Sequence, residues 1–317
     1  MVVCTAVAPE RRARIGRRMF AAHRQHWPFF REMLRDIYRF ISPKYQNLFL
    51  DYHVDMQPRY GHGKPPHPQL YGLIDRHRAA YRTLLQEFLT HQPQLTKLRN
   101  AKDETDPNAP AWNNGFLPGL DIVAIYGMLA HCRPARYVEV GSGNSTKVAA
   151  RAIREQGLPT QITSIDPYPR AEIDQLAQQV VRQPFETTDL AIFGQLQAGD
   201  IVFIDNSHRV LPNSDATVFF LDVLPRLAPG VVVHIHDMYL PYDYPQFMCD
   251  RGYSEQYMLA AFLLANPARY QTLMPNYFVS EDAELSQVLA PLWQQPALQG
   301  VERHGGSYWL RIGDSAT

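Results

Sequence analysis

The stretch YVEVGSGNST at residues 137–146 decides the fold. Its first four residues are typical of a short buried strand, and they run directly into a turn that contains Gly141 and Gly143. A helical stretch follows the turn at once, and Ser145 or Thr146 can cap it. Strand, glycine turn and helix in this order let backbone N–H groups approach a bound ligand. The stretch therefore predicts the first βα unit of a ligand-binding sheet.

Short β-branched runs alternate with helical stretches over residues 120–312, a pattern typical of βαβ units and a parallel sheet. We expect strands at Tyr137–Val140, Gln161–Ile165, Gln179–Val181, Ile201–Ile204 and Val231–Ile235, and later ones, suited to antiparallel pairing, at Tyr270–Met274 and Ser307–Ile312. We expect helices at Leu120–Cys132, Thr146–Glu155, Ala171–Ala177 and Ala216–Leu227. The predicted fold class is α/β, with a Rossmann-like, doubly wound, mostly parallel seven-stranded sheet.

The first hundred residues have a different character. Apolar residues at three-to-four spacing predict one helix within Arg17–Phe40 and a second over Pro68–Thr90, and a proline- and glycine-rich loop separates them. The polar stretch Lys102–Pro110 indicates a boundary. We therefore expect an N-terminal helical region over 1–101 and a catalytic domain over 102–317. The interleaved aromatics of the N-terminal helices need a partner, either the main domain or a second copy in a homo-oligomer.

The bulk composition limits the partners. Lys plus Arg equals Asp plus Glu, 31 each in 317 residues, so we expect no nucleic-acid partner. Three cysteines far apart in sequence form no disulfide framework, which fits a reducing cytosol. The N-terminal apolar run precedes its arginines, the wrong order for a secretory signal, and no run of about 20 apolar residues exists. The expected protein is cytoplasmic and has no membrane partner.

The glycine turn is neither GxGxxG nor a P-loop, because Thr146 stands at the sixth position from Gly141 and GK[ST] is missing. A phosphate cradle is therefore disfavoured. Asp166 ends the next strand, where an acidic group accepts hydrogen bonds from ribose hydroxyls. The alternatives are a turn that needs glycine for packing alone and an aspartate that caps the turn before Pro167. Glycine turn and Asp166 together favour an adenosine ligand.

Residues 139–143, EVGSG, resemble motif I of class I S-adenosylmethionine-dependent methyltransferases, and Asp166 matches the acidic residue of that family's second strand. The resemblance implies that the glycine turn follows the methionine and ribose portions of S-adenosylmethionine and that Glu139 faces the methionine amino end. Ser145 stands where the family often has a third glycine. The expected cofactor-binding residues are Glu139, Gly141, Ser142, Gly143, Ser145, Thr146, Asp166 and Asp205.

Two further predicted strands end in polar groups, IVFIDNSH at 201–208 and VVVHIHD at 231–237. If these strands are neighbours, Asp205, His208, His236 and Asp237 converge at the edge where doubly wound sheets bind ligands. Side-chain alternation puts His234 and His236 on one face of the strand, so we expect the backbone to turn near His236. The alternative is that the aspartates cap turns and the histidines are merely hydrogen-bonded, which we prefer for His234.

Two chemistries need such a cluster: a histidine that removes the acceptor's proton, and a divalent ion that lowers the pKa of the acceptor hydroxyl. The same stretches resemble a subgroup that includes metal-dependent sugar O-methyltransferases. That resemblance implies His208 as the base and Asp205 and Asp237 as ligands of Mg, while an imidazole among the ligands would also suit Mn or Fe. His236 occupies the first position of the subgroup's acidic pair, so the metal ligands would be Asp205, His236 and Asp237, with Asp205 and His208 as catalytic residues.

The predicted activity is methyl transfer from S-adenosylmethionine to the hydroxyl of a small-molecule acceptor. Aromatics within Met238–Tyr257 form either a lid over the acceptor or packing for the N-terminal helices. Residues 112–116 either close over the cofactor or form a hydrophobic staple. Three alternatives stay open, namely a non-methylating enzyme of the same cofactor, an iron-dependent enzyme and a non-catalytic adenosine-binding regulator. A nicotinamide dehydrogenase is disfavoured by the missing GxGxxG.

Overall fold

The computed structural model describes residue 31 and residues 33–314, and the chain divides into two compact units, 1–55 and 56–317. In the first unit, residues 33–41 are helical, as the apolar spacing within Arg17–Phe40 predicts. The rest of that predicted helix lies outside the described residues. Residues 56–101 group with the sheet, and the domain boundary expected at residue 101 stays a prediction.

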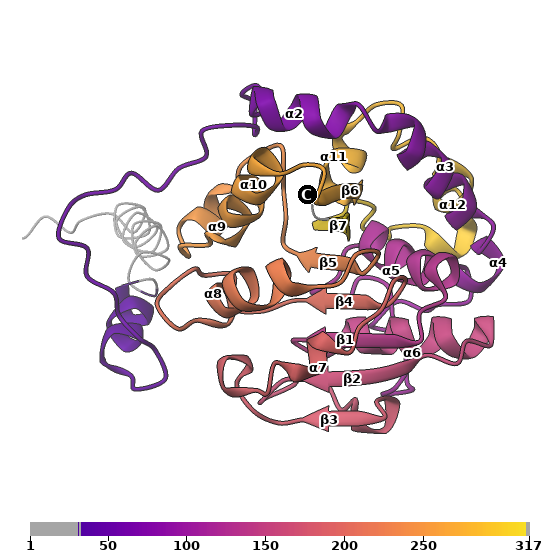
Figure 1. The fold of residues 1–317 in the computed structure, drawn as a ribbon, viewed down its shortest axis with the longest axis horizontal. Helices are drawn as coiled ribbons and strands as arrows, with labels where there is room; N and C mark the ends of the chain where they lie inside the picture. Colours follow the sequence, from indigo (N-terminus) through magenta and orange to yellow (C-terminus); the bar gives the residue numbers. More distant parts are fainter. Residues whose placement is uncertain (1–30, 32, 315–317) are drawn as a thin grey trace, which may run out of the picture. The chain divides into compact units, whose positions relative to one another are not determined.

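A single seven-stranded sheet organises the second unit (Figure 1). The strand order is β3-β2-β1-β4-β5-β7-β6, and β1 to β5 are parallel while β7 runs antiparallel to both of its neighbours. The strands are β1 Arg136–Val140, β2 Gln161–Ile165, β3 Gln179–Val181, β4 Ile201–Ile204, β5 Val232–His236, β6 Tyr270–Pro275 and β7 Ser307–Ile312. This confirms the predicted fold class, and each predicted strand is present within one residue of its expected ends.

The chain reverses its winding direction between β1 and β4. The connection from β1 leads to β2 and β3 on one side, whereas β4 begins the other half of the sheet. Val140 pairs with Ile204, so the loops that leave β1 and β4 emerge side by side. In an open α/β sheet this switch point is where ligands bind.

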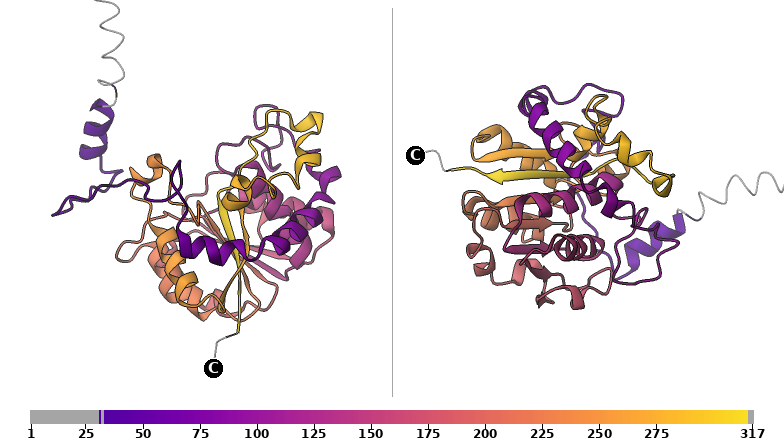
Figure 2. Two further views of the ribbon diagram at one scale, coloured as in Figure 1. Left: turned by 90° about the horizontal axis from the view of Figure 1, so that it is seen from above. Right: turned by 90° about the vertical axis from the view of Figure 1, so that its right-hand side faces the viewer.

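Helices cover both faces of the sheet, and in the view from above α10 and α5 lie on opposite sides (Figure 2). The buried side chains of β4, β5 and α5 form the middle of a continuous hydrophobic core. The helices of this unit are α2 Pro68–Asp75, α3 Arg78–Leu89, α4 Gln92–Leu95, α5 Gly119–Cys132, α6 Asn144–Gln156, α7 Ala191–Gly194, α8 Asp215–Val218, α9 Gln246–Cys249, α10 Glu255–Ala265, α11 Asn276–Glu281 and α12 Ala290–Trp293.

Three predicted helices differ from the observed ones. The prediction of a helix at Ala171–Ala177 is wrong, because only a 3-10 turn forms there, at Asp174–Leu176. The reason is that Gln178 already pairs with Ile162 of β2, through its backbone N–H and its side chain, so the segment continues into the sheet. The predicted helix Pro68–Thr90 is broken into α2 and α3. The stretch expected at Ala216–Leu227 changes from α8 through a π turn to a 3-10 turn that contains Pro225.

Among the described residues, no helix is long and apolar enough to cross a membrane.

Candidate active site

The turn after β1 lies against the end of β4. Gly141 has φ +80°, and a Cβ at this position would lie 1.8 Å from the carbonyl oxygen of Asp205. Only glycine permits both the left-handed backbone and this close approach. The backbone N–H of Asp205 also donates to the carbonyl of Val140 (2.8 Å). The glycine turn and the first residue of the polar cluster are therefore in direct contact.

Glu139 and Thr146 hold this turn from inside the protein. Both side chains are fully buried, the Thr146 hydroxyl donates to the Glu139 carboxyl, and the Gly143 N–H donates to the same hydroxyl (3.0 Å). Burial raises the pKa of Glu139 to about 8. Its hydrogen bond to the start of α6 gives Glu139 a structural part in shaping the turn, and its expected place beside the methionine amino end stays a prediction.

Asp166 faces the same turn from the end of β2. One carboxylate oxygen accepts the Ser142 N–H (2.8 Å) and the other accepts the Tyr168 N–H (2.8 Å). A carboxylate offers about four acceptor positions, so each oxygen can still accept a further hydrogen bond. The Ser142 hydroxyl is paired with Ser164 (2.6 Å). These contacts leave Asp166 able to bind a ribose hydroxyl.

The structure brings the predicted polar cluster together. His208 Nε2 lies 3.3 Å from Asp205 Oδ1 and 3.3 Å from Asp237 Oδ2. His236 Nδ1 lies 3.6 Å from an oxygen of each of the same two aspartates. His208 and Asp237 both have positive φ, +62° and +52°. Such backbone is costly for these residues and concentrates at functional sites, and it produces the expected turn at the end of β5.

Glu255, at the start of α10, completes the surroundings of His208. Its Oε1 lies 2.5 Å from His208 Nδ1, and both side chains are buried. The ring of His208 stacks on Tyr253 (centroids 4.7 Å apart). The sequence analysis missed Glu255, because a glutamate in the first turn of a helix is commonplace and no local motif links it to His208.

Asp121 of α5 is the second acidic residue that the sequence analysis missed. It is fully buried, and its Oδ2 lies 3.5 Å from His236 Nε2. Asn276, Ser307 and the Gly306 N–H donate hydrogen bonds to it at 2.7–2.9 Å. His236 is thus placed between Asp121 on one side and the aspartates of the cluster on the other.

Charge pairing sets the protonation of the cluster. Burial alone lowers the pKa of His208, but the attraction of Glu255 and the hydrogen bonds to Asp205 and Glu255 raise it to about 10. Burial is likewise outweighed at His236, whose pKa the two neighbouring aspartates raise well above its usual value. Burial by itself would raise the pKa of Asp205, but the two histidines outweigh this effect. The pKa of Asp205 is therefore well below its usual range. The neighbouring carboxylates therefore favour the protonated form of both imidazoles.

His234 belongs to the core and not to the cluster. Its ring stacks on Phe203 (centroids 4.1 Å apart) and meets Trp309 edge-on. Neither ring nitrogen has a hydrogen-bond partner among the described residues, and burial lowers the pKa of His234 to about 3. The structural interpretation preferred for His234 is thus supported, although by ring packing and not by a hydrogen bond.

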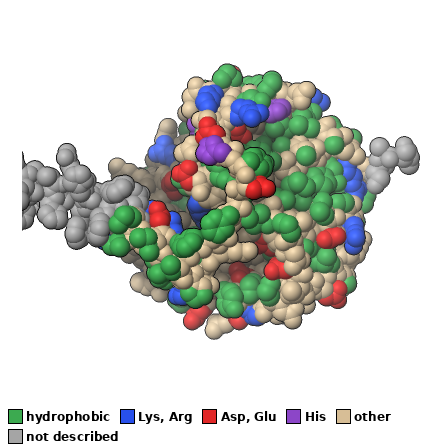
Figure 3. Space-filling model, turned by 90° about the vertical axis from the view of Figure 1, so that its left-hand side faces the viewer, with side chains coloured by type: hydrophobic (Ala, Val, Ile, Leu, Met, Phe, Trp, Pro, Cys, Tyr) green, Lys and Arg blue, Asp and Glu red, His purple; other side chains and the backbone are tan. Residues whose placement is uncertain are grey.

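A cavity of about 460 Å³ opens over the cluster at the carboxyl ends of the parallel strands. Figure 3 looks onto this edge and shows a hollow among charged and histidine side chains. The wall segment, Met238–Tyr257, contributes Tyr239, Met248 and Tyr253 to the lining. Phe116 also lines the cavity beneath the guanidinium of Arg170, whereas Trp112 is buried against Trp293.

The cluster does not fit a metal ion as it stands. Within residue 31 and residues 33–314, no group of three or more acidic, histidine or cysteine side chains is arranged to hold one. His208 Nε2 lies between the carboxylates of Asp205 and Asp237, where an ion bound to both would have to be. The expected ligands Asp205, His236 and Asp237 are close together, but the two carboxylates already contact His236 and His208.

Comparison with known protein families matches residues 138–238 to a methyltransferase domain. An uncharacterized protein of Archaeoglobus fulgidus is 32% identical over 91 residues, which is 27% of this chain and 41% of that protein. The chain thus matches less than half the length of this relative.

Two solved structures are similar at low identity. A SAH-bound methyltransferase of Podospora anserina has 14% identity and a TM-score of 0.38, with 76% of this chain and 95% of that chain covered. An O-methyltransferase of Bacillus cereus in complex with SAH has 14% identity and a TM-score of 0.36, with 73% and 91% covered. Residues 138–238 thus match a methyltransferase domain, and the strand order is that of the predicted Rossmann-like sheet.

Proposed function

We propose that the protein methylates a hydroxyl oxygen of a small-molecule acceptor, with His208 as the general base. The observation that carries this proposal is the buried pair of His208 and Glu255, which holds Nδ1 and leaves Nε2 at the carboxylates of Asp205 and Asp237 in the lining of the cavity. A hydroxyl must lose its proton as it attacks, and a positioned imidazole is suited to accept it. S-adenosylmethionine would be held along the turn after β1, by Asp166 and the backbone at Gly141, and would supply a methyl group on a positively charged sulfur.

The charge of the cluster supports a cationic ligand at this position. Four carboxyl groups, those of Asp121, Asp205, Asp237 and Glu255, surround only two imidazoles. Arg170 adds a third positive charge, 3.9 Å from Asp205 Oδ2, so the carboxyl groups outnumber the positive charges in contact with them by one. In a buried site this imbalance favours an incoming cation, because charges interact more strongly there than in water. A nearby cation also lowers the pKa of His208, which favours the neutral imidazole that a base requires.

Each residue then has a defined task. Asp166 would hold the ribose hydroxyls, and the Gly141 turn lets the cofactor approach the end of β4. Glu255 keeps a proton on Nδ1, so that Nε2 is the nitrogen that takes the acceptor's proton. Tyr239 and Tyr253 give the acceptor an aromatic wall.

The direct test compares His208→Gln with the wild type and with His131→Gln, a surface control whose imidazole pairs with Glu87 outside the cavity. Formation of S-adenosylhomocysteine is measured with a panel of phenols, sugars and hydroxy acids. We expect His208→Gln to lose about 100-fold or more in turnover, as for removal of a general base, while calorimetry shows retained cofactor binding. Full turnover by His208→Gln would remove this residue from the mechanism.

Metal dependence is a separate prediction. Since His208 lies between the two aspartates that would hold an ion, we expect dialysis against a chelator to leave turnover unchanged. A loss of activity that Mg, Mn or Fe restores would instead assign Asp205, His236 and Asp237 as ligands.

A further inference from the structure

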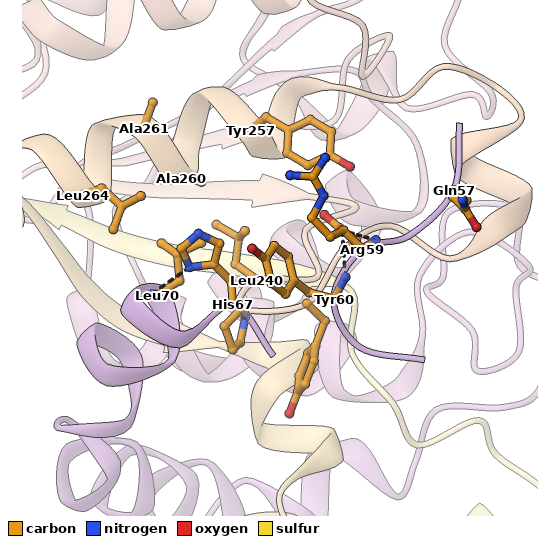
Figure 4. A pocket seen from close by; sticks show the side chains of 13 residues that line it. Gln57, Arg59, Tyr60, His67, Leu70, Leu240, Tyr257, Ala260, Ala261 and Leu264 are labelled. Atoms are coloured by element: carbon orange, nitrogen blue, oxygen red, sulfur yellow. Dashed lines mark hydrogen bonds between the residues drawn. The ribbon is translucent and has the colours of Figure 1, made fainter. Parts of the chain in front are cut away.

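A second cavity of about 440 Å³ is shown in Figure 4. It lies apart from the active site, and the two cavities share no lining residue. The wall segment separates them. Tyr239 lines the active-site cavity, whereas the residues that follow it, Leu240 to Asp243, line the second one. A ligand of the second cavity would therefore not contact His208, and this site does not depend on the proposed reaction.

Most side chains that line the second cavity are apolar. Aliphatic side chains come from α2, α10 and the wall segment, and aromatic rings stand among them; these residues are Leu70, Leu240, Ala260, Ala261, Leu264, Tyr60, Tyr242 and Tyr257. Ligand pockets are typically apolar concavities of roughly 300–1,000 Å³ with a few placed polar groups. The second cavity has the size and the lining of a small-molecule site.

Two side chains of this cavity offer hydrogen-bond donors that the described residues leave free. His67 Nδ1 accepts the N–H of Leu70 (3.3 Å), so in the neutral ring the proton is on Nε2, for which the described part of the chain provides no partner. The Arg59 guanidinium likewise has no hydrogen bond or ion pair among the residues that the structure describes. Figure 4 shows the Arg59 side chain reaching toward the ring of Tyr257.

The acidic residue of the cavity is already engaged. Asp243 Oδ2 accepts the N–H groups of Arg59 (2.6 Å) and Tyr60 (3.0 Å), and the Tyr257 hydroxyl hydrogen-bonds to the same carboxylate. Its charge is thus compensated by three donors. A ligand of this cavity would therefore meet a mostly apolar lining together with two donors, the Arg59 guanidinium and the Nε2–H of His67.

We propose that this cavity binds an amphipathic organic anion, a molecule with an aromatic or aliphatic body and one carboxylate or sulfonate. The body would pack between α2 and α10, and the anionic group would meet Arg59 and His67. Charge-assisted hydrogen bonds to a guanidinium are the strong ones, so Arg59 should account for a large part of the preference for an anion.

The test uses anilinonaphthalene sulfonate as the probe and follows its fluorescence on titration of the full-length protein. Ala261→Trp fills the cavity, and Leu221→Trp is its control because Leu221 is a solvent-exposed position outside the cavity. Arg59→Gln removes only the cation, and because Arg59 is solvent-exposed we expect this variant to fold. We expect saturable binding that Ala261→Trp abolishes, that Leu221→Trp leaves unchanged and that Arg59→Gln weakens about tenfold.

Several outcomes would overturn the proposal. They are an absence of saturable binding to the wild type, equal binding by a folded Ala261→Trp variant, and displacement of the probe by S-adenosylmethionine. Equal affinity of the wild type for neutral N-phenylnaphthylamine, or no effect of Arg59→Gln, would contradict the anion. Circular dichroism verifies that each variant is folded, and Arg59→Gln keeps the test decisive if Ala261→Trp does not fold.

Discussion

Glu255 acts on His208 through one short hydrogen bond inside the protein. Its negative charge is a main cause of the raised pKa of His208, about 10. A base works only in its neutral form, so turnover should rise with pH toward that pKa. In Glu255→Gln the hydrogen bond can persist while the charge is lost, and the pKa of His208 must fall. We expect the rising limb of the pH profile of kcat to move to lower pH, by about one unit or more.

Glu255→Asp is the matched control, since it keeps the charge and should keep the rising limb near its wild-type position. A merely structural role for Glu255 would lower kcat at every pH without moving the limb. If the rising limb of the pH profile of kcat did not move in Glu255→Gln while His208→Gln was inactive, Glu255 would not control the pKa of His208.

Glu139 gives a second prediction at the scale of one residue. Its folded-state pKa is about 8, above its usual 4.5, so the folded protein prefers the protonated carboxyl. The contribution to stability is complete below 4.5 and is lost as the pH rises toward 8. Within that window the free energy of unfolding should fall by roughly 1 kcal/mol per pH unit because of this group. Glu139→Gln should flatten that slope in urea denaturation series, and an identical slope in both proteins would contradict the assignment.

The sequence predicts some site residues and not others for a physical reason. Asp205, His208, His236 and Asp237 follow two strands that are neighbours in the sheet, so chain order alone brings them together. Asp121 and Glu255 come from helices packed against opposite parts of the sheet, and only the tertiary fold places them at the cluster. No spacing rule connects them with the strand ends.

Among the structural elements, the turn after β1 is the least tolerant of substitution. Gly141→Ala would place a methyl group 1.8 Å from the Asp205 carbonyl in a left-handed backbone conformation. The turn or the end of β4 must then move, and we expect S-adenosylmethionine affinity to fall about tenfold or more, measured by calorimetry. Gly194→Ala is the control, because a Cβ there meets no atom within 4 Å. Equal affinity in both variants would separate the turn from cofactor binding.

Strands were easier to predict than helices in this chain. The core strands are runs of β-branched and aromatic residues between polar turns, so their limits are visible in the sequence. Helix limits depend on contacts that the sequence does not display. Residues 171–177 have helical composition, yet the pairing of Gln178 with β2 draws the segment into the sheet.

For the whole molecule, the division into residues 1–55 and 56–317 makes the second unit a candidate for independent folding. It contains the complete sheet and every residue of the proposed active site. A protein of residues 56–317 should therefore unfold cooperatively and bind S-adenosylmethionine as the full chain does. Loss of binding on removal of residues 1–55 would assign part of the cofactor site to the first unit.

The same truncation tests self-association. Met33, Ile37 and Phe40 recur at three-to-four spacing along the helical residues 33–41, and an apolar helix face is stable in water only when a partner covers it. We propose a second copy of the chain as that partner. Sedimentation should then show a dimer for the full chain, a monomer for residues 56–317 and a monomer for the full chain with Ile37→Asp. A monomeric full chain at micromolar concentration would exclude self-association through this face.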